Sequence, residues 1–191
     1  MYIRWLGNSC LEIKANRNIL IDPNYKIKPE SIPDILLITH EHDDHFSPKS
    51  REKYPGANLY APKTTIKKHS INGTAVKGDE TIEQGIKVLR CNCYNTEDAV
   101  AYFYKGLLHT ADTSQFTVPE KNVKILFTAC FKDKYENYLE ACHRIDPKIV
   151  VPYHYNPESE KERKEAEDLI ELVRKEGFYA RPLDIGEKIL I

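Results

Sequence analysis

The sequence has no long hydrophobic run, no excess of one charge and no regular cysteine framework. No stretch approaches the ~20 apolar residues that a membrane-spanning helix needs, and Met1 to Gly7 lack the apolar core of a signal peptide. A formal net charge of −1 without a long basic run argues against an extended nucleic-acid surface. The five cysteines are odd in number, so we interpret them as reduced thiols of a cytoplasmic protein.

The chain has 191 residues, which is enough to bury one substantial core, and no repeat, low-complexity tract or linker divides it. We therefore expect one domain over residues 1–191. Strand patterns alternate with short helical patterns, which predicts an α+β fold with two mixed sheets stacked between outer helices. From residue 74 the apolar period changes to two, so we expect a second, antiparallel block to begin there.

Apolar patterns and turn residues set the expected elements. The predicted strands cover residues 2–6, 10–14, 18–21, 35–38, 58–60, 74–77, 81–83, 86–91, 100–104, 106–110, 123–127, 149–151, 178–180 and 188–190. Four helices are predicted: one after the cap Ser47 and Pro48, one near Pro62, one behind a capping box of Asp133 and Glu136, and one capped by Asn156, with Pro157 first and Gly177 closing it.

A histidine-rich loop follows the predicted strand at residues 35–38. Its branched apolar residues are typical of a strand buried on both faces. Directly after it the chain carries nitrogen and carboxylate donors within six positions: His40, His42, Asp44 and His45. Histidine is a common ligand of zinc-like ions, and a carboxylate suits a harder position. The spacing predicts a metal site, and donors on a turn can point toward two neighbouring ions.

Two other apolar strands end in residues of the ligand type, one at Asp112 and one at His154. Sites in layered α/β proteins gather in the loops beyond the carboxyl ends of strands. If these strands are neighbours of the strand before the histidine loop, all six donors can converge. Asp22 also ends a strand, where it is either a turn former or a partner that orients a ligand histidine.

Five segments together resemble the metallo-β-lactamase superfamily, and they fall in the family's order across almost the whole chain. They are Leu6-Gly7-Asn8-Ser9, Leu20-Ile21-Asp22-Pro23, Thr39-His40-Glu41-His42-Asp43-Asp44-His45, His109-Thr110-Ala111-Asp112-Thr113 and Val151-Pro152-Tyr153-His154-Tyr155. The resemblance implies a four-layer αβ/βα sandwich with metals along one edge. The compact length and Pro152 to Tyr155 resemble the simple archaeal and bacterial hydrolases related to ascorbate-6-phosphate lactonase.

The resemblance also implies a role for each donor. His40 and His42 would hold a first ion, Asp44, His45 and His154 would hold a second, and Asp112 would bridge the two. One departure is clear, because the family usually supplies a third histidine to the first ion and the stretch from Arg90 to Thr96 has none. Cys93, Asn95 or water is then expected to complete that shell. The glycine that often precedes the bridging aspartate is Ala111 here.

Two ions that share a water would lower its pKa from 15.7 toward ~7, which makes a metal-activated hydroxide available at neutral pH. We therefore expect a hydrolase that cleaves an ester, lactone or phosphodiester in a small molecule, with Asp44 as ligand and catalytic residue. One alternative is a nuclease of the same superfamily, which the near-zero charge disfavours. The flavodiiron branch needs glutamate where His42 stands and an added flavin domain. A non-catalytic metal-binding protein is the third alternative, supported by the missing histidine.

The residue types leave the metal and the substrate open. Mixed histidine and carboxylate donors accept one or two divalent ions, with Zn²⁺ expected first and Mn²⁺ or Fe²⁺ as alternatives. The sequence shows no specificity pocket and does not fix the oligomeric state. Residues expected to contact substrate or support the ligands are Asp22, Cys93, Tyr94, Asn95, Thr113, Tyr153 and Asn156.

Overall fold

The computed structural model describes residues 1–120 and 122–191, and its strands form two mixed sheets. The first sheet has the spatial order β13 (Lys188–Leu190), β1 (Tyr2–Trp5), β2 (Leu11–Lys14), β3 (Asn18–Ile21), β4 (Ile35–Leu37), β5 (Asn58–Pro62) and β6 (Thr74–Val76). The second has the order β12 (Ile149–Pro152), β11 (Ile125–Thr128), β10 (Leu107–His109), β9 (Ala99–Tyr104), β8 (Lys87–Cys91) and β7 (Glu80–Thr81).

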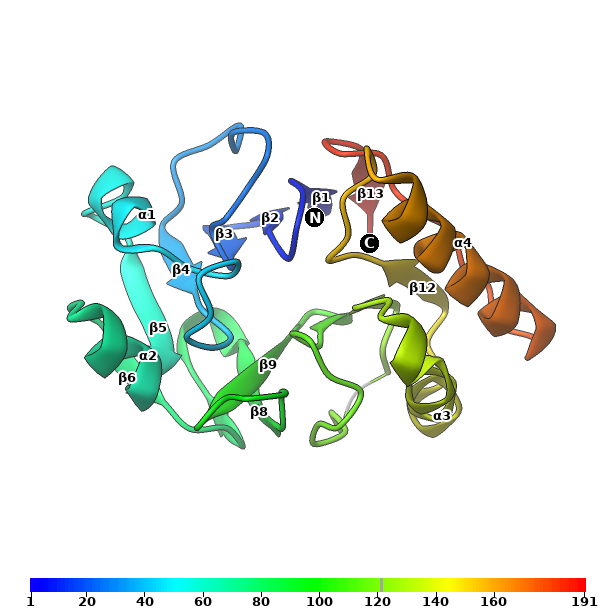
Figure 1. Ribbon diagram of the computed structural model, residues 1–191. Helices are drawn as coiled ribbons and strands as arrows, with labels where there is room; N and C mark the ends of the chain where they lie inside the picture. The colour runs from blue at the N-terminus through cyan, green and yellow to red at the C-terminus, as the bar shows by residue number, and fades with distance from the viewer. Residues whose placement is uncertain (121) are drawn as a thin grey trace.

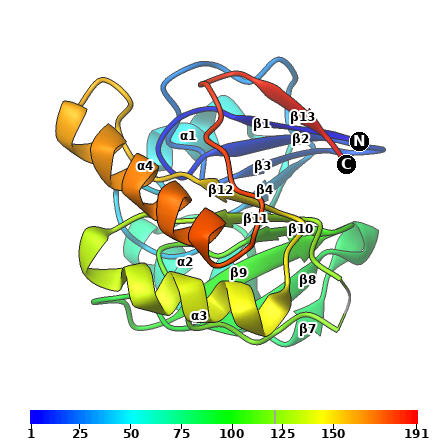
Figure 2. The same cartoon turned by 90° about the vertical axis from the view of Figure 1, so that its right-hand side faces the viewer.

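Helices cover the outer side of each sheet (Figure 1). Helices α1 (Pro48–Lys53) and α2 (Lys63–His69) lie on one side of the molecule, and α3 (Tyr135–Ile145) and α4 (Glu160–Lys175) lie on the opposite side, where they run across the second sheet (Figure 2). The order is helices, sheet, sheet, helices, so the predicted α+β sandwich is confirmed. No described helix is long and apolar enough to cross a membrane.

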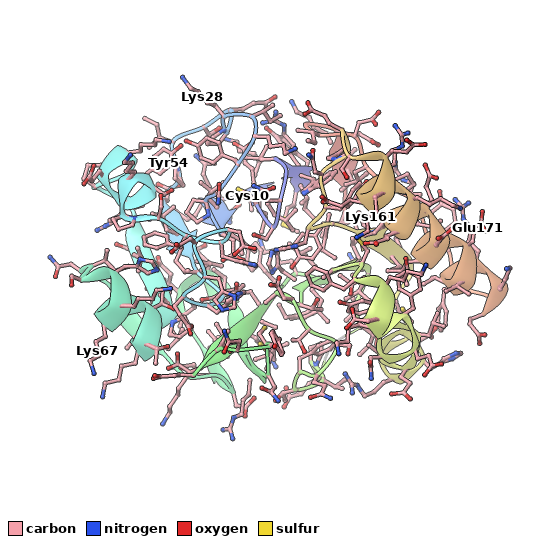
Figure 3. The ribbon with its side chains drawn as sticks, viewed as in Figure 1. Cys10, Lys28, Tyr54, Lys67, Lys161 and Glu171 are labelled. Carbon is pink, nitrogen blue, oxygen red and sulfur yellow. The ribbon has the colours of Figure 1, made fainter. Side chains whose placement is uncertain are left out.

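Alternating side chains explain how the layers stack. In β3, Ile19 and Ile21 join the core between the sheets, whereas Leu20 packs on the other face, under α1 and α2. Cys10 belongs to that outer cluster and Tyr54 packs against it; Figure 3 labels Tyr54 beside α1 and Cys10 further toward β2. Each buried Leu or Ile side chain stabilises the fold by about 1.5–3 kcal/mol relative to exposure. Both sheets contribute to the central cluster, so one core joins them.

Each sheet is antiparallel in one half and parallel in the other. Strands β13 to β3 pair antiparallel and β3 to β6 pair parallel. Likewise β7 to β10 pair antiparallel and β10 to β12 pair parallel. Parallel strands end at the same edge, so the loops after β3, β4, β10 and β12 start from the carboxyl ends that are expected to carry a site.

The structure corrects the predicted block boundary and one strand. Strand β6, predicted as the start of the second block, pairs parallel with β5 in the first sheet, because partner choice depends on a long-range contact that periodicity does not encode. The strand predicted at 81–83 is Glu80–Thr81, followed by a 3-10 turn at Glu83–Gly85. Residues 178–180 form only a single bridge, Ala180 to Val150, because Pro182 follows closely.

Two of the predicted helix caps are wrong. Asp133 lies inside a 3-10 turn (Lys132–Lys134), and α3 begins after Lys134 without a side-chain cap. Helix α4 is capped by Ser159, whose Oγ accepts from Glu162 N at 3.4 Å, and not by Asn156. The Asn156 Oδ1 instead accepts from Glu158 N at 3.2 Å, a local turn that competes with capping. The predicted cap Ser47 precedes α1, but its side chain makes no capping hydrogen bond.

Candidate metal centre

The structure brings together all six side chains that the sequence predicts as metal ligands. They form two groups that share Asp112, and within each group the donor atoms lie within 4.8 Å of one another. We call His40, His42 and Asp112 the three-donor group, and Asp44, His45, Asp112 and His154 the four-donor group. The histidine loop follows β4, Asp112 lies three residues after β10, and His154 lies two residues after β12. The shared strand edge therefore explains the convergence.

Short donor-to-donor distances define the four-donor group. The Nε2 atoms of His45 and His154 lie 3.1 Å apart. Asp112 Oδ1 lies 3.0 Å from His45 Nε2 and 3.5 Å from His154 Nε2. Asp44 Oδ2 approaches His154 Nε2 at 3.2 Å from the solvent side, with 54% of its side chain exposed. The His45 end of the group is thus buried, whereas the Asp44 end is exposed to solvent.

The three-donor group is smaller and has one carboxylate. His40 Nε2 lies 3.2 Å from His42 Nδ1 and 3.7 Å from Asp112 Oδ2. The predicted substitute Cys93 is buried, but it belongs to neither group; its side chain packs with Ala99 and Ala111. Asn95 contributes its backbone carbonyl, which lies 3.2 Å from His42 Nε2. Asn95 therefore orients a ligand candidate, and among the described residues no further His, Cys, Asp or Glu joins the three-donor group in place of the missing histidine.

A buried aspartate orients His45. Asp22 Oδ2 lies 2.7 Å from His45 Nδ1, so this nitrogen donates its proton to Asp22, and Nε2 is the nitrogen directed at the four-donor group. Asp22 also accepts from Thr39 N at 2.8 Å and from Thr39 Oγ1 at 2.7 Å. The prediction that Asp22 supports a ligand histidine matches this contact.

The partners of the other histidines assign their free nitrogens. Thr39 Oγ1 donates to Asp22, so it is left to accept from His40 Nδ1 at 3.0 Å, and His40 Nε2 faces the group. The carbonyl of Asn95 accepts from His42 Nε2, which leaves Nδ1 of His42 facing His40. Hydrogen bonds to the outer nitrogens thus aim three imidazole lone pairs at the shared centre.

Charge is concentrated around His45 and Asp112. Burial alone would lower the pKa of His45, but the carboxylates of Asp112 and Asp22 outweigh burial and hold the pKa well above its usual value. Burial would raise the pKa of Asp112, yet the His45 and His154 rings hold it far below its usual range. The contact with His154 lowers the pKa of Asp44 to about 2. A positive charge near the carboxylates of Asp22, Asp44 and Asp112 is therefore favourable.

His40 behaves differently. Burial, followed by repulsion from His45, lowers the pKa of His40 to about 3, so its ring is neutral at pH 7. A neutral imidazole is the form that binds metals. His109, fully buried behind the site, also has a lowered pKa, because burial disfavours its charged form.

The donors fit divalent metal ions. In a tetrahedral zinc site with Zn–N bonds of ~2.0–2.1 Å, two ligating nitrogens lie roughly 3.3 Å apart. The histidine pairs of the two groups are separated by 3.2 and 3.1 Å. In addition, Asp112 Oδ1 is buried without a hydrogen bond of acceptable geometry to any described residue, although His45 Nε2 is nearby. A divalent ion held by these residues would satisfy this oxygen and would offset the repulsion between the facing nitrogens.

Four of the ten described non-glycine residues with a positive φ angle lie around this centre. Positive φ angles occur at Asp22 (+44°), Asn95 (+55°), Ala111 (+53°) and His154 (+61°). This left-handed conformation costs about 1–2 kcal/mol for a residue with a side chain. Such strain persists where the surrounding contacts impose it, and it is typical of functional sites. Ala111 shows why a glycine would suit the position before Asp112.

The remaining predicted residues have separate places. Tyr153 is fully buried behind the site and donates to Ala111 O at 2.7 Å, so it holds the segment before Asp112. Thr113 Oγ1 accepts from Gln115 N at 2.9 Å, a local turn contact. Tyr94 is 89% exposed. Tyr153 is therefore a supporting residue, and neither Tyr94 nor Thr113 contacts a ligand candidate.

Two supporting residues were missed by sequence reasoning. Thr39 connects Asp22 with His40, and His109 Nε2 donates to the carbonyl of Ser9 at 2.9 Å while its ring packs edge-on against Tyr153. Each lies at or just after the end of a buried strand, shortly before a ligand candidate, and this placement was the available signal. Thr39 connects the loops after β3 and β4, and His109 connects β10 with the turn between β1 and β2.

A cavity of about 240 Å³ opens beside the four-donor group. Asp44 and His154 line one end, and the predicted substrate contact Asn156 lines another part of the wall. Tyr94 and Tyr153, which were also expected at a substrate, are not among its lining residues. The candidate centre is thus accessible from one side through a small pocket.

Comparisons with known proteins agree with this geometry. The family model described as the Beta-lactamase superfamily domain matches residues 2–154. A UPF0173 metal-dependent hydrolase of Methanobrevibacter smithii is similar to the chain, with 28% identity over 200 residues and 82% of each protein covered. A second one, of Thermoplasma volcanium, is 26% identical over 185 residues, covering 81% of this chain and 83% of the relative.

Solved structures share the fold. Igni18, described as a novel metallo hydrolase from the archaeon Ignicoccus hospitalis, gives a TM-score of 0.75 at 19% identity, covering 98% of this chain and 97% of that one. CmlA beta-hydroxylase gives 0.74 at 14% identity, covering 100% of this chain and 54% of that one. A hydrolase and a hydroxylase on one architecture show that the fold alone does not choose the reaction. With most of its length matched by the family model, the chain belongs to the metallo-β-lactamase superfamily.

Proposed function

We propose that the chain is a metal-dependent hydrolase that cleaves an ester, lactone or phosphodiester bond in a small molecule. Asp112 carries this proposal, because it is the one side chain common to two donor groups. Such sharing is the arrangement that two neighbouring ions need. The relatives named metal-dependent hydrolases support the same activity. A cytoplasmic location and a single domain over residues 1–191 belong to the proposal, and the core shared by both sheets supports the latter.

The chain's residues would hold zinc, or manganese or iron, in both groups. Bound divalent ions would lower the pKa of a water molecule to ~7 and polarise a carbonyl or phosphoryl oxygen. The neutral His40 and the outer hydrogen bonds of His42 and His45 keep imidazole nitrogens directed at the ions. Asp22 and Thr39 fix the rings from behind, so the ligands need no rearrangement before binding.

Asp44 is the residue we assign to the reaction itself. It is held ionised beside His154, and over half of its side chain is exposed toward the cavity side of the centre. Its carboxylate can therefore accept a hydrogen bond from the attacking water and orient it. In the hydrolysis, the water oxygen bonds to the acyl or phosphoryl centre, the bond to the leaving oxygen breaks, and the water's proton ends on the leaving group.

The test combines elemental analysis with a substrate panel. Protein purified without chelator or added metal should contain a divalent metal and hydrolyse at least one ester, lactone or phosphodiester. Asp44→Asn should weaken metal binding in the four-donor group and still lose most of the activity when added metal saturates that group, because it removes a ligand charge as well as the charge that orients water. Metal binding without hydrolysis of any panel substrate would favour a non-catalytic metal-binding protein, and activity on nucleic acid alone would favour a nuclease.

A further inference from the structure

The cavity beside the four-donor group is lined by several kinds of side chain. Asp44 and His154 stand at the candidate metal centre, whereas Glu162 and Glu165 of α4 line the wall formed by that helix. Phe131 and Tyr155 supply aromatic surface between them. At about 240 Å³ the cavity is smaller than the roughly 300–1,000 Å³ of pockets for drug-sized ligands, so it suits a small compound.

Glu165 is the acidic group with the weakest partner. Its side chain is 23% exposed, and its one ion pair among the described residues is with Lys161 Nζ at 3.9 Å. Lys161 is 85% exposed, and such a pair contributes little because water screens it. A largely buried carboxylate that lines a cavity and has only this solvent-screened ion pair can attract a positive ligand group.

Glu162 has a structural role and also carries a negative charge. Its Oε2 accepts from Asn156 N at 2.7 Å, and its position in the first turn of α4 suits the positive end of the helix dipole. The ammonium of Lys26 donates to Asn156 Oδ1 on the exposed side, and no ion pair between Lys26 and Glu162 is found among the described residues. Glu162 therefore adds negative charge to the wall, while Glu165 is the group that a substitution can test without disturbing the helix start.

The buried thiol of Cys130 lines the same cavity as both carboxylates. Cys130 lines the cavity, and burial, followed by the charges of Glu165 and Glu162, raises its pKa to about 12. Both glutamates are thus close to the cavity floor. Aromatic surface combined with carboxylates is a favourable setting for an alkylammonium group.

We propose that this cavity binds a positively charged ammonium group of the substrate, with Glu165 as its main counter-ion. The inference rests on the proposed hydrolase function and specifies its substrate class: a small cationic ester or lactone whose reacting carbonyl lies at Asp44 and His154. The same carboxylates repel a phosphate or carboxylate group in this position, which disfavours substrates that carry an anionic tail into the cavity.

The test uses two esters of the same shape that differ by one positive charge. They are acetylcholine and its neutral isostere, in which carbon replaces the quaternary nitrogen. The metal-loaded protein should hydrolyse acetylcholine with a kcat/KM about tenfold or more above that of the isostere. Glu165→Gln should bring the two values close together, while Glu165→Asp should preserve much of the preference.

Glu171→Gln is the matched control, because Glu171 lies on the same helix, is exposed and projects away from the molecule (Figure 3). It should leave the preference unchanged. Calorimetry with tetramethylammonium, which has no lone pair for a metal, measures the cavity independently of hydrolysis. Its binding should weaken about tenfold in Glu165→Gln and remain in Glu171→Gln.

The outcomes separate the two proposals. Hydrolysis of the neutral ester with no preference for charge, or a preference that survives Glu165→Gln, overturns the cavity assignment and leaves the hydrolase intact. Tetramethylammonium binding that depends on Glu165, in a protein that hydrolyses nothing, supports the cavity and overturns the hydrolase. Neither binding nor hydrolysis overturns both.

Discussion

The two donor groups share Asp112 but differ in composition and support. The four-donor group has two carboxylates, and its His45 is backed by the buried carboxylate of Asp22. The three-donor group has only the shared carboxylate, and its histidines are backed by the neutral hydroxyl of Thr39 and the carbonyl of Asn95. Both ligand number and negative charge favour the four-donor group.

The two donor groups should therefore bind neighbouring ions with different affinities. A divalent ion gains more from two carboxylates and a charged partner behind its histidine than from neutral hydrogen bonds. We therefore expect the four-donor group to bind first and more tightly. The second ion, in the three-donor group, should then control activity when metal is scarce.

The largest effect should come from Asp112→Asn, which removes the shared charge while keeping the side chain's size. Both groups should lose metal affinity, and activity should fall by roughly 10³-fold or more. The fold should persist, because Asp112 lies on a loop beyond β10 and its replacement leaves no core cavity. Elemental analysis and circular dichroism check these points. Normal activity with both ions bound would remove Asp112 from the mechanism.

His42→Ala should remove one ion and keep the other. The three-donor group would have two donors left, whereas the four-donor group is untouched. We expect about one ion per chain and a loss of activity of roughly 10²-fold or more. His143→Ala is a control, because His143 is half exposed and its ring pairs with Glu176 away from either group. Two retained ions in His42→Ala would refute the assignment of this histidine.

Asp22→Asn tests the support behind the tighter group. The amide keeps the volume but removes the charge that His45 Nδ1 faces at 2.7 Å. Metal affinity of the four-donor group should fall by about 10–100-fold, the usual effect of altering the partner of a ligand. Metal titration of the variant measures this affinity. The difference in affinity between the two binding events should be smaller in the variant than in the unchanged protein. An unchanged titration would show that His45 needs no charged partner.

The groups should also differ in proton release. The raised pKa of His45 means that metal binding at pH 7 displaces about one proton from the four-donor group, whereas the neutral His40 releases none. In the metal-free protein, the stabilisation from charged His45 is fully present below about pH 6.5 and is lost as pH rises through the higher folded pKa. The difference in Tm between loaded and metal-free protein should therefore widen as pH rises.

Calorimetry in buffers of different ionisation enthalpy counts the displaced protons. His42→Ala leaves only the four-donor group intact, so metal binding to this variant should still release the proton. Proton uptake, or no exchange in the tighter event, would contradict the pairing of His45 with Asp22 and Asp112.

Ala111→Gly should have the smallest effect. Glycine relieves the strain of φ +53°, worth about 1–2 kcal/mol, but it loses a buried methyl and gains freedom in the unfolded chain. The net change in unfolding free energy should stay within about 1 kcal/mol, because these opposing contributions are of similar size. Thermal unfolding measures it. A large change in either direction would show that the backbone before Asp112 is held differently from what the structure describes.

Local patterns in the sequence predicted much of the fold. Short runs of branched apolar residues at 35–38 and 19–21, bounded by turn residues, predicted the strands before the histidine loop and Asp22, because a strand buried on both faces is apolar at consecutive positions. The place of β6 was not predicted, because it depends on a partner chosen through the folded core. The start of α4 was displaced because Asn156 makes a turn contact where a cap was expected.

The candidate site shows the same division. The six donors were predicted because their residue types and their positions after buried strands are visible in the sequence. The role of Asn95 was not, because its backbone carbonyl contacts His42 and any residue type supplies a carbonyl. The cavity beside the four-donor group could not be predicted either. In the sequence, Glu162 and Glu165 have the pattern of exposed charges on a helix, and only the fold places them in the wall of a cavity that His154 also lines.

The unequal pair of metal sites is tested most directly by titrating metal-free protein with Zn²⁺ or Mn²⁺ in a calorimeter while activity is measured in parallel. We expect two binding events of unequal affinity, with the tighter one retained in His42→Ala and activity rising with the weaker one. Two equally tight events, or activity that is complete after the first, would contradict this expectation.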